Sequence, residues 1–149
     1  MHQGELLAAI EFKSQIGPSF GNNFNNRAEE ALGSATDLWA ASREGAFRPS
    51  ARPFLGYLML LEDCYRSRTP VKTVGPHFPV LPEFKGASYR DRYSILIEKL
   101  LRERLYDGAC FLLSSTEAVT TGDFIEPHPE VTFQKFVTPL LGHVASICK

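Results

Sequence analysis

The tripeptide Glu11-Phe12-Lys13 ends an apolar run that begins at Leu6. Because side chains alternate along a strand, Glu11 and Lys13 are expected to project from one face. A carboxylate is a hard ligand that suits Mg²⁺, which binds few protein groups together with waters and phosphate oxygens. A neighbouring lysine can orient or deprotonate an attacking water and offset charge that builds on phosphorus. The alternative is an exposed ion pair at a strand end, since this short pattern alone is weakly specific.

The same tripeptide occurs a second time in the chain, as Glu83-Phe84-Lys85. The second copy lies between Pro82 and Gly86, and no apolar run leads into it. A proline at this position argues against a central strand. We therefore predict that Glu11 and Lys13 carry the chemistry and that the second copy lies in a loop.

A cluster of amide side chains followed by an arginine comes directly after the first tripeptide. Asparagine can hydrogen-bond adenine and arginine can hydrogen-bond guanine in the major groove of DNA. Asparagine is also typical of turns and of helix N-caps. The pattern alone favours this turn and cap interpretation over DNA contact. The candidate DNA-binding residues are Asn22, Asn23, Asn25, Asn26 and Arg27.

The periodicity of apolar residues predicts an α/β domain, with strands and helices alternating along the chain. The expected order is strand, helix, strand, long loop, helix, strand and helix. The last helix contains Pro139, which is expected to kink it. The predicted ranges are a strand over 6–13, a helix over 25–43, a strand over 54–61, a loop over 64–87, a helix over 88–105, a strand over 109–113 and a helix over 131–147.

The composition narrows the possible function classes. The 149 residues carry a net charge of −1, which argues against non-specific coating of a polyanion. No apolar stretch is long enough to span a membrane. Three widely spaced cysteines are typical of free thiols in a reducing cytoplasm. The sequence has no GxxxxGK[ST] loop, so an ATP-hydrolysing function loses support.

Four longer segments closely resemble the Xho-type restriction endonucleases, which cut CTCGAG. The resemblance covers essentially the whole chain. It implies the PD-(D/E)xK fold, a mixed sheet flanked by helices, and a Mg²⁺-dependent, ATP-independent cut of double-stranded DNA in a restriction-modification system. It also implies that Glu11 is the acidic metal ligand, Lys13 the catalytic lysine and Gln15 a neighbour in the site. A homodimer is expected, since a two-fold protein matches a palindromic site. The four segments are residues 10–27, 53–63, 84–89 and 102–107.

One departure from the family pattern concerns the second acidic residue. The nuclease site also needs an aspartate on the strand that precedes the Glu11 strand. In this sequence Glu5 is the only acidic residue before Glu11. We therefore expect residues 1–149 to be the C-terminal part of a single endonuclease domain, cut near a hairpin at Gly4, with little or no cleavage by this chain itself. The alternatives are a non-cleaving remnant that binds DNA or a full-length subunit, and a remnant that does not fold.

Overall fold

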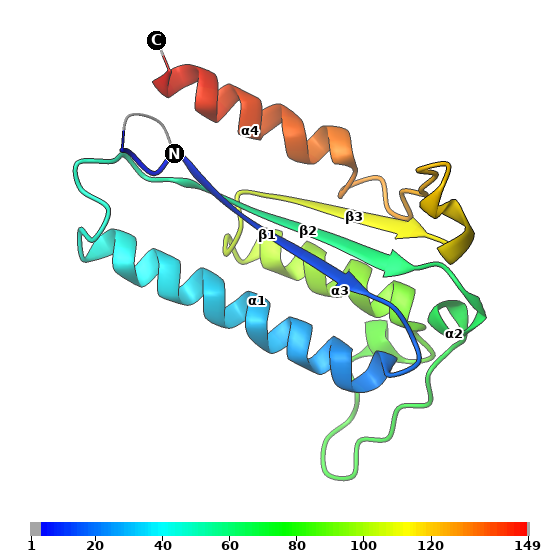
Figure 1. Cartoon of the computed structure of the whole chain (residues 1–149). Helices are drawn as coiled ribbons and strands as arrows, with labels where there is room; N and C mark the ends of the chain where they lie inside the picture. The colour runs from blue at the N-terminus through cyan, green and yellow to red at the C-terminus, as the bar shows by residue number, and fades with distance from the viewer. Residues whose placement is uncertain (1–3, 149) are drawn as a thin grey trace.

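The computed structural model describes residues 4–148, which form three strands, four α-helices and two short 3₁₀ turns. The order of the longer elements matches the order predicted from the periodicity (Figure 1). The bounds are β1 (Ala8–Gln15), α1 (Phe20–Arg43), β2 (Phe54–Glu62), α2 (Tyr65–Arg68), a 3₁₀ turn (Pro82–Phe84), α3 (Tyr89–Arg102), β3 (Gly108–Ser114), a second 3₁₀ turn (Thr116–Val119) and α4 (Phe133–Ile147).

The sheet has the order β1-β2-β3, and both strand pairs are parallel. Glu11 lies opposite Tyr57, and Tyr57 lies opposite Ala109. The mixed sheet expected from the family resemblance is therefore not found among the three strands of residues 4–148, although an isolated antiparallel bridge joins Leu113 and Ile125. The physical reason is that each pair of strands is joined by a helical crossover, which returns the chain in the same direction.

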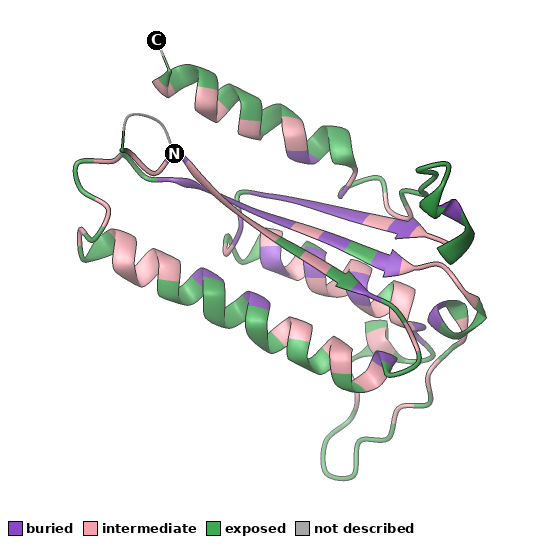
Figure 2. Ribbon diagram, in the orientation of Figure 1, coloured by how far each residue is buried: buried purple, intermediate pink, exposed green. Residues whose placement is uncertain are grey.

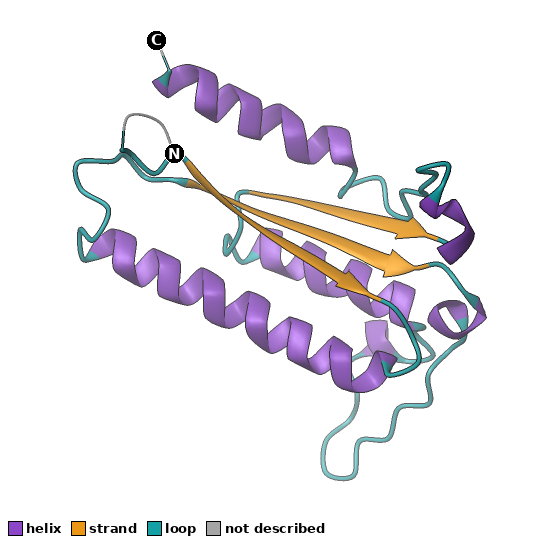
Figure 3. Cartoon of the chain, viewed as in Figure 1, coloured by secondary structure: helices purple, strands orange, loops and turns teal. Residues whose placement is uncertain are grey.

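Helices cover both faces of the sheet, as Figure 3 shows. The main core lies between the sheet and helices α1 and α3, and its largest fully buried side chains include Tyr57, Met59, Tyr93 and Phe111. A smaller cluster on the other face joins Phe54 and Cys110 to Phe136 of α4. Figure 2 shows β2 and β3 mostly buried, in agreement with their continuous apolar sequences.

Strand β1 is the least protected strand of the sheet. Only β2 pairs with it among the described residues, so its outer edge has no strand neighbour. Phe12 points away from the main core and is 66% exposed. The active-site candidates on β1 therefore lie on an edge strand.

Helix α1 begins at Phe20, five residues before the predicted start. The asparagines therefore lie within its first turns, and the expectation that they precede the helix as N-caps was wrong. The N-cap is Ser19, whose side chain makes no capping hydrogen bond. Phe20 is buried and its ring stacks on Tyr89 at 5.5 Å between centroids. This packing offsets the weak helix propensity of asparagine.

The sequence Ser88-Tyr89-Arg90-Asp91 predicts a capping box, with Asp in place of Glu or Gln, and helix α3 begins with it. The Ser88 hydroxyl accepts a hydrogen bond from the Asp91 backbone N–H at 3.2 Å, and the Asp91 carboxylate accepts one from the Ser88 N–H at 2.9 Å. The preceding loop contains the short helix α2, which was not predicted. Pro139 lies inside α4, and the expected kink stays a prediction.

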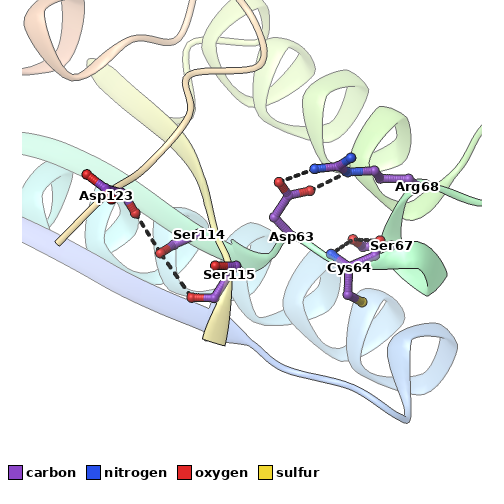
Figure 4. Close-up of polar contacts among 7 residues, drawn as sticks. All are labelled: Asp63, Cys64, Ser67, Arg68, Ser114, Ser115 and Asp123. Atoms are coloured by element: carbon purple, nitrogen blue, oxygen red, sulfur yellow. Dashed lines mark hydrogen bonds and ion pairs between the residues drawn. The ribbon is translucent and has the colours of Figure 1, made fainter. Parts of the chain in front are cut away.

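The ends of β2 and β3 are fixed by local polar contacts (Figure 4). Both Asp63 carboxylate oxygens accept hydrogen bonds from Arg68, which ties α2 to the end of β2. The Ser114 hydroxyl donates to the Asp123 carbonyl at 2.8 Å and closes the loop after β3. All three cysteines are free, and no helix within residues 4–148 has the length and apolarity needed to cross a membrane.

Candidate active site

Glu11 and Lys13 project from the same face of β1, as the strand pattern predicted. This is the face that α1 and α3 cover. The Lys13 ammonium lies 3.1 Å from Glu11 Oε1, and the two side chains are 23% and 14% exposed. The pair is therefore a half-buried group on a sheet and not a freely solvated ion pair.

A third charged residue, Glu30 of α1, completes the group. Its Oε2 lies 3.0 Å from Lys13 Nζ and 2.7 Å from Arg27 Nη1. Lys13 thus lies between two carboxylates, one from β1 and one from α1. Glu30 was not among the predicted site residues, because its position opposite β1 depends on how the helix packs. The signal it offered was its spacing from Arg27, since residues three apart share one helix face.

The charge state of Lys13 follows from these neighbours. Burial lowers the pKa of Lys13, but hydrogen bonds and attraction to Glu30 and Glu11 outweigh it, so that the pKa is raised. Arg27, followed by Lys13, lowers the pKa of Glu30. Lys13 is therefore an ammonium ion near neutral pH. In this arrangement it can orient a water and offset negative charge, but it has no free electron pair with which to take a proton.

Tyr106 holds the other oxygen of Glu11. Its hydroxyl lies 2.6 Å from Glu11 Oε2 and 2.9 Å from the carbonyl oxygen of Ala31 in α1. Burial, followed by the hydrogen bond to Glu11, raises the pKa of Tyr106, so the hydroxyl keeps its proton and can donate it. Tyr106 lies 95 positions from Glu11 in the chain, and no local pattern links the two.

Glu11 Oε1 has the properties expected of a metal ligand. It is buried, and apart from its ion pair with the Lys13 ammonium it has no hydrogen-bond partner within the described structure. Mg²⁺ commonly binds through one or two carboxylates, with waters and phosphate oxygens as the other ligands. No group of three or more His, Cys, Asp or Glu side chains could hold a metal within residues 4–148. A Mg²⁺ ion held by Glu11 would therefore take most of its ligands from substrate and water.

Gln15 lies on the same face of β1 but deeper in the protein. It is 3% exposed, and its Oε1 accepts a hydrogen bond from the Tyr93 hydroxyl of α3. Its Nε2 is buried and finds no partner in the described residues. Gln15 thus connects the active-site strand to the main core.

The candidate DNA-binding residues separate into two groups on α1. Arg27 is part of the charged group, through its contact with Glu30. Asn22, Asn25 and Asn26 are exposed, and Asn23 is half-buried. The structure therefore brings Arg27 to Glu11 and Lys13, and leaves three of the amides on the surface of the adjoining helix turns.

Comparisons with known proteins match the sequence of this chain to an enzyme family. Residues 1–126 match the family model described as restriction endonuclease XhoI. The chain is 54% identical over 141 residues to the type II restriction enzyme BstVI of Geobacillus stearothermophilus, covering 95% of this chain and 63% of the relative. It is 58% identical over 97 residues to the type II restriction enzyme XhoI of Xanthomonas vasicola, covering 65% of this chain and 39% of that enzyme. The chain thus spans less than two thirds of these relatives, and no solved structure matches it.

Proposed function

Because the chain belongs to the XhoI restriction endonuclease family, we propose that residues 1–149 are the C-terminal part of a type II restriction endonuclease domain. The proposed reaction is Mg²⁺-dependent hydrolysis of phosphodiester bonds in double-stranded DNA, without ATP. The proposed recognition sequence is CTCGAG, and the proposed setting is the cytoplasm. The single observation that carries this function is the half-buried group formed by Glu11 and Lys13 of β1 with Tyr106 from the turn before β3.

In this proposal each residue of the group has a separate role. Glu11 Oε1 holds Mg²⁺, which when bound lowers the pKa of a coordinated water and polarises the phosphate. Tyr106 fixes the orientation of the Glu11 carboxylate through its other oxygen. Lys13, as an ammonium ion, orients the attacking water in line with the scissile bond and offsets the charge that builds on the phosphate oxygens. Glu30 and Arg27 hold Lys13 in place from α1.

We propose that the first turns of α1 contact DNA through Asn22, Asn23, Asn25, Asn26 and Arg27. The exposure of three of these amides supports this role, since a major-groove contact requires an accessible side chain.

We also propose that the intact enzyme is a homodimer, because CTCGAG is palindromic and a two-fold protein presents the same residues to each half-site.

The test is cleavage of a plasmid that carries CTCGAG, with protein in excess so that one slow turnover is detected. We expect little or no product, because the family's aspartate does not precede Glu11 in this sequence. Any product should require Mg²⁺, arise at CTCGAG, and disappear in Lys13→Ala. Cleavage that persists in EDTA or in Lys13→Ala would contradict the proposed roles.

A second candidate is a DNA-binding module that does not cleave. The observation that favours it is that only one carboxylate of the candidate site, Glu11, has a buried oxygen with no partner besides Lys13. Many Mg²⁺ sites use two carboxylates. A gel shift at low salt separates the two candidates. Preference for a CTCGAG duplex over a scrambled duplex, without a cut product, would support the module.

A further inference from the structure

A second charged site lies at the far end of α1, away from Glu11. It is a pocket lined by Trp39, Ser42, Arg43, Arg52 and Arg104. These residues come from the end of α1, from the segment before β2 and from the turn after α3. Three arginines from three separate segments thus line one pocket together with Trp39.

The wall formed by Trp39 and Arg52 is held in place by neighbouring contacts. The Arg52 guanidinium carbon lies 4.2 Å from the centroid of the Trp39 ring, and its Nη2 donates to Asp107 Oδ1 at 2.8 Å. The Trp39 Nε1–H donates to the Leu105 carbonyl at 2.8 Å. A guanidinium fixed by stacking and by one carboxylate loses little freedom when its remaining N–H groups bind a ligand.

The pocket carries excess positive charge. Asp107 pairs with Arg52, whereas Arg43 and Arg104 form no ion pair with a carboxylate of the described chain. Three arginines and one aspartate leave a net charge of two positive units beside the indole. Such a pocket suits an anion with several acceptor oxygens.

Arg104 follows the end of α3 in an unusual backbone conformation. Its φ is 56°, in the left-handed region that is unfavourable for a residue with a Cβ. Glycine or asparagine is usual at this position after a helix. The turn is fixed by hydrogen bonds from Arg104 N–H to Leu101 O at 2.9 Å and from Leu105 N–H to Leu100 O at 3.0 Å. A charge that only complemented the α3 dipole would not need this position, since Arg102 already lies in the last turn.

We propose that this pocket binds a phosphate group of the DNA backbone outside the scissile position. The inference rests on the proposed nuclease function and adds to it. Trp39 and Arg43 follow Glu30 by nine and thirteen residues on α1. At 1.5 Å per residue they lie roughly 14 to 20 Å along the helix from the catalytic group. That distance corresponds to about four to six base pairs of duplex, so the pocket would position DNA that flanks the cut.

The first arm of the test uses inorganic phosphate. Trp39 is the only tryptophan of the chain, so its fluorescence reports on this pocket alone. We expect a saturable change in emission with phosphate, compared with chloride at equal ionic strength, and a severalfold weaker affinity in Arg104→Gly. Glycine accepts the left-handed backbone, so the thermal midpoint of this variant should be unchanged or higher. A response that does not saturate would overturn the anion site.

The second arm measures binding of a CTCGAG duplex by fluorescence anisotropy at several salt concentrations without Mg²⁺. We expect Arg104→Gly to weaken binding and to reduce the slope of log affinity against log salt by about 0.9, the value for one lost phosphate contact. Arg102→Ala removes the same charge two residues away and is the matched control. Equal effects of the two variants, or saturable phosphate binding with an unchanged duplex slope, would overturn the assignment to DNA. Loss of cleavage or of CTCGAG preference tests the nuclease function alone, because this arm requires neither.

Discussion

Glu11-Phe12-Lys13 and Glu83-Phe84-Lys85 are the same tripeptide in two different structures. The first lies on a strand, where residues two apart share a face, and Glu11 pairs with Lys13. The second lies in a 3₁₀ turn, and Glu83 pairs with Lys99 of α3 at 3.0 Å instead of with Lys85. The strand, and not the residue types alone, therefore makes Glu11 and Lys13 a candidate site.

The two glutamates also differ in how firmly they are held. Glu11 has a hydroxyl partner from the core in Tyr106, and its side chain is 14% exposed. The Glu83 side chain is 39% exposed and lies on the surface. An exposed ion pair contributes little to stability, whereas a fixed carboxylate whose second oxygen contacts a lysine is suited to a metal that displaces this contact.

The largest expected difference between the two copies is in catalysis. In any form of the enzyme that cuts CTCGAG, Glu11→Gln or Lys13→Ala should lower the single-turnover rate by at least about 10²-fold, the scale for losing one group that stabilises developing charge. Glu83→Gln and Lys85→Ala are the matched controls and should leave the rate unchanged. Equal losses in both pairs of variants would refute the assignment of the site to β1.

The next effect concerns stability. Tyr106→Phe removes a hydroxyl that contacts Glu11 and the Ala31 carbonyl, and leaves Glu11 Oε2 without this donor. The free energy of unfolding should fall by about 1 to 3 kcal/mol in a urea titration. Tyr65→Phe removes an exposed hydroxyl and should change it little. An unchanged free energy of unfolding in Tyr106→Phe would mean that the core does not hold Glu11.

The smallest effects are shifts in carboxylate titration, measured by NMR. The pKa of Glu30 lies below its ordinary value through Arg27 and then Lys13, and it should rise in Arg27→Ala and in Lys13→Ala. The pKa of Glu83 is lowered first by a backbone hydrogen bond and then by Lys99, so it should rise in Lys99→Ala and stay constant in Lys85→Ala. A rise in Lys85→Ala would mean that the second tripeptide forms its own ion pair.

The sign of the pH dependence follows from the direction of the Glu30 shift. Because the pKa of Glu30 is lower in the folded protein, its ion pairs stabilise the fold above the ordinary pKa of 4.5. This stabilisation is lost as the pH falls through the lowered pKa. The pKa of Lys13 is instead raised in the folded protein, so the ion pairs of Lys13 stabilise the fold at lower pH. This stabilisation is lost only when the pH rises above 10.5.

Local sequence patterns predicted what depends on neighbours along the chain. The strand that carries Glu11, the order of the longer elements and the capping box at Ser88 are of this kind. The early start of α1 depends on Phe20 stacking against Tyr89, which lies far away in sequence. Glu30 and Tyr106 join the site only through the packing of α1 and of the turn before β3. No spacing along the chain encodes these contacts, so they had to come from the structure.

The outer edge of β1 has a consequence for how copies of the protein associate at high concentration. Its outward N–H and C=O groups have no strand neighbour in residues 4–148, and the exposed Phe12 lies beside them. The charges that usually discourage pairing at an edge, Glu11 and Lys13, point instead toward α1. Two copies that paired along β1 would extend the sheet from the strand that carries the candidate site. Concentrated preparations should therefore associate while they keep their helical structure.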